Sequence, residues 1–207
     1  MKIVVFGATG GTGREVVRQA LHAGHYVTAV ARTPSAIPFQ HEHLKILRGD
    51  VLAPETLPQT VTGQDIVVSA VGAPDRSPTR IYSAGLMNIL LAMHNAGVRR
   101  LICISASGLD PGALIQKLIA KPILWWLFKD GYTDMSHMEI IVKASNVDWT
   151  ILRPPRLTDS PRKGKYKVAV NEQLSNGWIL SRADLADYIV KHLSDPTIHR
   201  AVVELAY

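Results

Sequence analysis

The sequence predicts an α/β protein with a doubly wound parallel sheet. Short apolar runs alternate with amphipathic segments of helical periodicity along most of the 207 residues, which is the pattern of a parallel sheet covered by helices. A glycine-rich stretch, GATGGTG at 7–13, joins the first apolar run to the first amphipathic segment. The length suits one hydrophobic core better than two. The chain is therefore expected to form a single Rossmann-like domain.

The expected strands are short, nearly continuous apolar runs, which are typical of strands that helices cover on both faces. They lie at 2–6, 26–31, 44–50, 65–72, 99–108, 148–155 and 201–206. The expected helices have apolar residues at helical spacing and recognisable ends, such as Gly24 and Gly97 as terminators, Pro54 as an opener and Ser181 as a cap. They lie at 13–24, 54–61, 80–97, 136–146 and 181–193.

Two segments, 109–131 and 156–178, break the alternation and are expected on the ligand side of the sheet. The first contains the apolar stretch 113–128, which we interpret as a buried or interface helix, so a homo-oligomer contact through it stays open. The second continues a run of basic side chains that begins at the end of the sixth strand. These are Arg153, Arg156, Arg162, Lys163, Lys165 and Lys167.

The composition narrows the class of protein and its partners. The net charge of +6 favours an anionic partner, but the basic cluster lacks interleaved aromatics, so nucleic-acid binding is not expected. The single cysteine, Cys103, excludes an intrachain disulfide, and no signal peptide or membrane-spanning run is recognised, so we expect a cytoplasmic protein. The two histidines of HEH at 41–43 lack an identifiable third ligand, and no metal site is predicted.

The glycine-rich stretch has the spacing GxxGxxG through Gly7, Gly10 and Gly13. In a strand–loop–helix unit, such glycines allow a tight turn, a close approach of a pyrophosphate to the backbone, and close packing of helix on strand. The backbone amides at the helix N-terminus then face the phosphates. Gly11 belongs to the same loop, and the Thr9 and Thr12 hydroxyls can add donors. The loop is predicted to bind a dinucleotide.

The end of the second strand indicates which dinucleotide is bound. Sites specific for NAD place an Asp or Glu there, to hold the ribose 2′-hydroxyl. This chain has AVARTPS at 29–35, with Arg32 at the strand end and no acid. A guanidinium suits a 2′-phosphate, and Ser35 can add a hydroxyl. The sequence therefore favours NADP(H) as the cofactor.

Several stretches together resemble a known family, the atypical short-chain dehydrogenases/reductases. They are GATGGTG, ARTPS, GDV at 49–51, SAVG at 69–72, ISASG at 104–108 and DWTILRPPRLTD at 148–159. Within that family the chain looks most like the NAD(P)H-binding, NmrA-like branch of the biliverdin reductase B/flavin reductase type. The resemblance covers nearly the whole chain.

The resemblance implies roles for further residues along the ligand side. Asp50 and Val51 would border the adenine, and Ala70, Val71 and Gly72 would line the adenosine ribose. At the other end of the cofactor, the resemblance implies that Ser105 or Ser107 faces the nicotinamide. Pro154 and Pro155 would border the nicotinamide on its other side.

Two departures from the family pattern bear on the reaction. No tyrosine is followed four residues later by a lysine, so the Tyr-x-x-x-Lys pair that transfers a proton to carbonyl substrates is absent. Arg156 stands where the biliverdin reductase type has a histidine, and Arg156 is our candidate for binding an acceptor's anionic group. Direct hydride transfer to a flavin such as FMN, a quinone or a tetrapyrrole-like acceptor needs less from the protein. The alternative is a non-catalytic NADP-binding sensor or regulator of the NmrA type.

Overall fold

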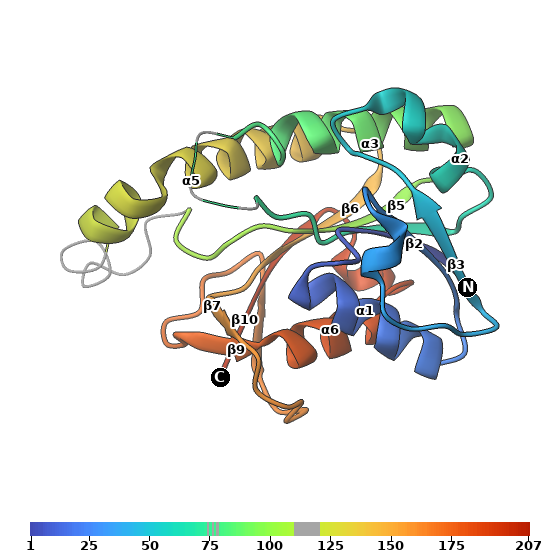
Figure 1. The fold of residues 1–207 in the computed structure, drawn as a ribbon. Helices are drawn as coiled ribbons and strands as arrows, with labels where there is room; N and C mark the ends of the chain where they lie inside the picture. The colour runs from blue at the N-terminus through green and yellow to red at the C-terminus, as the bar shows by residue number, and fades with distance from the viewer. Residues whose placement is uncertain (74, 76, 78, 110–120) are drawn as a thin grey trace.

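A predominantly parallel sheet forms the centre of the protein (Figure 1). The structure, a computed structural model, describes residues 1–73, 75, 77, 79–109 and 121–207, the side chains of 121–129 excepted. The strand order is β3-β2-β1-β4-β5-β6-β10-β8, and only the last of these strands, within the described residues, pairs in antiparallel fashion. In that order the bounds are Leu44–Arg48, Tyr26–Ala31, Lys2–Phe6, Ile66–Ser69, Arg100–Ile104, Asp148–Arg153, Ala201–Ala206 and Lys167–Val170. The predicted Rossmann-like, doubly wound sheet is confirmed.

Helices cover both faces of the sheet, as the continuous apolar strands require. On one face lie α1 (Gly11–His22) and α6 (Arg182–Lys191); on the other lie α2 (Pro58–Val61), α3 (Ser83–Ala96) and α5 (Lys121–Ala144) (Figure 1). The side chains of β1 alternate between the two cores. Ile3 and Val5 pack under α1 and α6, whereas Val4 and Phe6 pack under α2, α3 and α5.

The predicted strands and helices occur where the sequence places them, with two differences. The expected helix at 54–61 is a 3-10 turn (Pro54–Thr56) followed by the single turn of α2. The helix expected to begin at 136 begins at Lys121, because Gly131 is accommodated inside α5 and does not end it. The subunit contact left open for 113–128 lies outside the described residues, because these exclude 110–120 and the side chains of 121–129.

The segment 156–178 leaves the main sheet and then returns to it. Its first residues form β7 (Arg156–Thr158), which pairs in parallel with β9 (Ile179–Ser181) in a separate two-stranded sheet. Between them, β8 returns to the edge of the main sheet beside β10. The sequence pattern did not predict β7, β8 or β9, because each has only three or four residues, too few for a clear alternation. The β7–β9 pairing brings the two ends of this segment together.

Candidate functional site

A cleft of about 600 Å³ opens at the carboxyl ends of the central strands, where parallel α/β sheets bind their ligands. Its walls come from the loops that follow β1, β2, β3, β4 and β5, with contributions from α5, β7 and α6. The lining includes twelve of the residues singled out from the sequence. They are Gly7, Thr9, Gly10, Gly11, Thr12, Arg32, Asp50, Val51, Ala70, Val71, Gly72 and Ser105.

Two glycines of the loop are required by the protein's own packing. Gly7 has a φ of +77°, and a Cβ there would lie 2.3 Å from the backbone oxygen of Ala70 on the neighbouring strand end. A Cβ on Gly13 would lie 2.1 Å from the oxygen of Gly7. Gly10 is different, because the nearest atom to its Cβ would be 3.4 Å away. The protein itself does not need a glycine at position 10, so this bare backbone is left for a ligand.

The N-terminus of α1 has the features of an anion-binding site. Gly10 caps the helix without a side chain, so no side chain accepts from the first amides, and the first turn carries no acidic residue. Unsatisfied amides and the helix dipole together attract negative charge at this point. The loop and the start of α1 therefore present backbone amides that can bind an anion, with no competing carboxylate in the first turn.

At the end of the cleft beside β2 and β3, Arg32 is an exposed lining residue just after β2. Ser35 lies in the following 3-10 turn, outside the lining. The carboxylate that lines this side belongs to Asp50, whose Oδ1 accepts a hydrogen bond from the amide of Leu52 at 3.0 Å. The charge at the end of β2 is therefore positive, and the nearby acid already stabilises its own turn.

The opposite side of the cleft contains a buried polar network centred on Glu139 of α5. Ser105 donates its hydroxyl proton to Glu139 Oε1 at 2.8 Å. The guanidinium of Arg153 donates two hydrogen bonds to the same carboxylate, from Nε at 2.8 Å and from Nη2 at 2.6 Å. Lys143 Nζ donates a third at 3.0 Å. Ser105, Glu139 and Arg153 are all buried. Because its hydroxyl proton is already donated to Glu139, Ser105 can only accept a hydrogen bond from a ligand.

The network makes the stability of the protein depend on pH. Burial raises the pKa of Glu139, but the Arg153 guanidinium and the other donors outweigh burial and hold that pKa below the usual 4.5. The stabilisation is therefore complete above 4.5 and is lost as the pH falls through the lower pKa of the folded state. We expect the stability advantage of the natural protein over Glu139→Gln, measured by urea unfolding, to shrink in acid. An advantage that stays constant from neutral pH to well below 4.5 would contradict this assignment.

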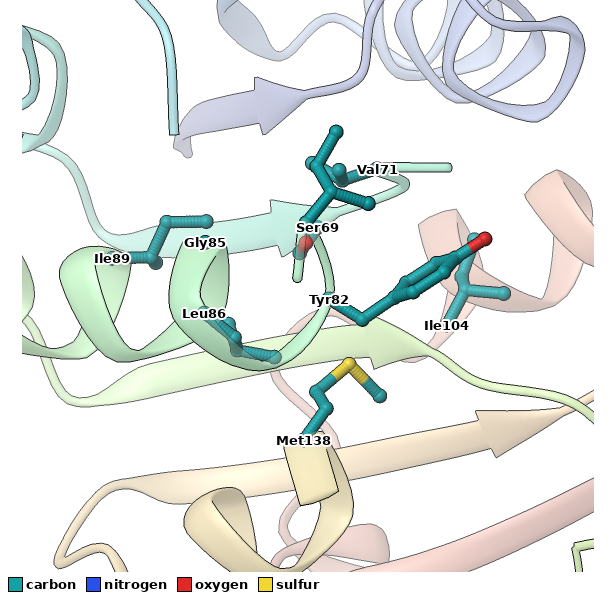
Figure 2. A pocket seen from close by; sticks show the side chains of 9 residues that line it. Ser69, Val71, Tyr82, Gly85, Leu86, Ile89, Ile104 and Met138 are labelled. Carbon is teal, nitrogen blue, oxygen red and sulfur yellow. The ribbon is translucent and has the colours of Figure 1, made fainter. Parts of the chain in front are cut away.

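An apolar layer lies directly behind the cleft (Figure 2). Val71, Tyr82 and Ile104 line both the cleft and this layer, and Met138 closes the layer from the side of α5. The Tyr82 hydroxyl accepts a hydrogen bond from the amide of Ala73 at 3.0 Å, and burial raises the pKa of this tyrosine. This side of the cleft thus offers a largely apolar surface for a flat ring.

Some of the residues singled out from the sequence lie outside the lining. They are Gly13, Ser35, Ser107, Pro154, Pro155 and Arg156. The backbone amide of Ser107 donates a hydrogen bond to the backbone oxygen of Pro154 at 2.9 Å. Arg156 is exposed, and the next residue of β7, Leu157, lines the cleft instead, because successive side chains of a strand face opposite ways.

The cationic cluster expected after the sixth strand is smaller than the sequence indicates. Arg153 is buried on Glu139. Arg162 pairs with Asp187 of α6 at 2.8 Å, and the Lys163 ammonium lies over the ring of Tyr207 at 3.9 Å. Arg153 is therefore not part of any cationic rim around the cleft, whereas Arg162 and Lys163 each have a partner in the protein but stay exposed.

The cleft residues that were not singled out from the sequence include Met135, which contributes apolar surface, and Arg182, which contributes a second guanidinium. Leu157, which also contributes apolar surface, belongs to the segment that was expected on the ligand side. No sequence pattern indicated a role for Arg182, because this residue follows β9, a strand of three residues that the sequence pattern did not predict. Among the helices that the structure describes, none combines the length and apolar character needed to cross a bilayer.

Comparisons with known proteins agree with this geometry. A family model described as NAD(P)H-binding matches residues 7–196. A reductase of Aspergillus terreus, pytE, is 28% identical over 92% of this chain and 90% of its own length. Two solved structures share the fold: a short-chain dehydrogenase/reductase of Veillonella parvula in complex with NADP (21% identical, TM-score 0.83, covering 100% of this chain and 94% of that one), and the anaerobillin reductase ChuY of Escherichia coli O157:H7 (21%, TM-score 0.79, 100% and 97%).

Proposed function

The chain belongs to the NAD(P)H-binding family, and from that premise we propose that it is an NADPH-dependent reductase that passes a hydride to a conjugated acceptor. The acceptor class is a flavin, a quinone or a tetrapyrrole-like ring. The pyrophosphate would lie on the glycine loop, the 2′-phosphate against Arg32, and the nicotinamide toward Ser105. NADPH would supply the hydride, and the residues of the chain would hold the two rings together in the cleft.

The make-up of the cleft beside Ser105 carries this proposal. On α5 the described residue that lines the cleft is Met135. Glu139, four positions later, is bound to Ser105 and Arg153, so neither a tyrosine nor a lysine occupies this pair of positions. Neither a lysine nor a histidine lines the cleft in the part of the chain that the structure describes, and burial raises the pKa of Tyr82, the tyrosine in the lining. A carbonyl substrate would need a positioned acid. A conjugated ring can accept the hydride directly and take its proton from water.

Two relatives support a reductase over other uses of a dinucleotide. The relative pytE is described as a reductase, and ChuY, whose fold is shared, is described as an anaerobillin reductase. The test is NADPH oxidation, followed by absorbance, with FMN, riboflavin, biliverdin and small quinones as acceptors. Turnover with at least one acceptor is expected. Tight NADP⁺ binding with no turnover for any of them would instead favour the non-catalytic sensor.

The choice of NADPH over NADH is tested at Arg32. Replacing Arg32 with alanine removes the cation beside the 2′-phosphate, and we expect NADPH binding to weaken by about 1–3 kcal/mol, the range for a hydrogen bond to a charged group. NADH lacks that phosphate, so its affinity should stay the same. Isothermal titration with both nucleotides provides the measurement. An equal loss for both nucleotides, or no loss for either, would contradict the assignment of Arg32.

A further inference from the structure

Arg182, the first residue of α6, lies against the glycine loop although more than a hundred and fifty residues separate them in sequence. A Cβ placed on Gly11 would lie 2.7 Å from Cδ and 2.9 Å from Nε of Arg182. The side chain therefore passes directly over the start of α1. Arg182 can lie this close because Gly11 has no side chain, whereas at Gly7 and Gly13 the missing side chain makes room for backbone atoms.

The arginine is held in place but its guanidinium is only partly used. Nη1 donates to Asp159 Oδ1 at 2.8 Å, and within the described residues no other hydrogen bond of the guanidinium is found. The Asp159 side chain is 89% exposed, and an ion pair with so exposed a carboxylate contributes little free energy. The remaining N–H donors of Arg182 are therefore free for a ligand in the cleft.

We infer that Arg182 is a pyrophosphate-binding residue, which faces the dinucleotide from across the glycine loop. This inference rests on the proposed cofactor site but not on the proposed reaction. The α1 amides and the Arg182 guanidinium would hold the pyrophosphate between them, and a guanidinium's planar fork suits two phosphate oxygens.

Two arginines, Arg32 and Arg182, line the cleft within the described part of the chain. Arg32 lies after β2, where the 2′-phosphate is proposed, and Arg182 lies over the loop, where the pyrophosphate is proposed. The two side chains therefore divide the recognition of the cofactor's negative charge. Each should be detectable with a ligand that carries only one of the two groups.

The experiment compares Arg182→Met with the natural protein, using NADPH, ADP and 2′-AMP as ligands in isothermal titration. ADP carries a pyrophosphate without a 2′-phosphate, and 2′-AMP the reverse. We expect NADPH and ADP to bind about 10- to 100-fold more weakly, as for the loss of a charged hydrogen-bonding group, and 2′-AMP to bind unchanged. Arg32→Ala should give the opposite pattern for ADP and 2′-AMP.

The matched control is Arg18→Met, which also removes one positive charge and one exposed ion pair, here with Glu15 on the outer face of α1. It should leave the affinity for all three ligands unchanged. Equal weakening of all three ligands by Arg182→Met, or the same weakening by Arg18→Met, would overturn the inference, as would unchanged ADP binding. Since only binding is measured, a protein that binds NADPH but reduces no acceptor refutes the reductase proposal and leaves this test intact.

Discussion

Glu139→Ala is expected to destabilise the protein by about 3–5 kcal/mol, the range for breaking a buried ion pair on one side. The substitution removes the carboxylate that accepts two hydrogen bonds from the guanidinium of Arg153, a residue that is 5% exposed. It also removes the acceptor for the Ser105 hydroxyl. A buried charge that loses its carboxylate is far more costly than the pair was stabilising, because its desolvation is no longer compensated to the same extent.

Urea unfolding of the natural protein and two further variants tests this expectation. Lys143→Ala removes the half-exposed donor to the same carboxylate and should cost less than about 1 kcal/mol. Joining Glu139→Leu with Arg153→Met removes both buried charges, and this pair should recover most of the loss. If Glu139→Ala lowered the free energy of unfolding no more than Lys143→Ala does, the description of Glu139 and Arg153 as a buried ion pair would be contradicted.

Gly13→Ala is expected to abolish dinucleotide binding and to destabilise the protein by more than about 3 kcal/mol, above the usual range for overpacking. The added Cβ would lie 2.1 Å from the oxygen and 2.7 Å from the carbonyl carbon of Gly7, and 3.0 Å from the Cα of Ala8. These are backbone atoms of the loop and cannot move aside as a flexible side chain can. The start of α1 would therefore be pushed away from β1.

Two other glycines provide controls for Gly13→Ala in thermal unfolding and NADPH titration. Gly10→Ala should cost no more than about 1 kcal/mol of stability, since its Cβ has room, but should weaken NADPH binding by crowding the phosphate position. Gly131→Ala, inside α5 with no atom within 4 Å of the new Cβ, should stabilise the fold by about 0.5–1 kcal/mol. Equal stability of Gly13→Ala and Gly10→Ala would contradict the packing described for the loop.

The parts of the fold that the sequence predicted are those encoded locally. The residues of β1 after Lys2, IVVF, are all apolar because both faces of the strand are covered, and the glycine loop follows them directly in the chain. The same locality explains why the cleft could be anticipated, since the carboxyl ends of parallel strands meet at one edge. Twelve of the residues singled out line the cleft because each comes directly after a strand or opens α1.

What the sequence did not reveal depends on contacts between distant segments. Arg153 reads as one more basic residue of a charged run, and only the packing of α5 on β6 places Glu139 against it. Arg182 reads as a surface residue after a serine cap, and only the packing of α6 beside α1 places it over the loop. Arg156 and Leu157 could not be told apart, because a strand of three residues has no readable alternation.

The pairing of β7 with β9 has a consequence for how such a protein can diversify. Three parallel residue pairs, from Arg156↔Ile179 to Thr158↔Ser181, join the two ends of the intervening segment beside the cleft. Because the ends are fixed, lengthening that segment changes the closure entropy only slowly and leaves Leu157 and Arg182 in position. Residues can therefore be inserted between the two strands, which changes the surface beside the cleft while the elements that line the cleft keep their places.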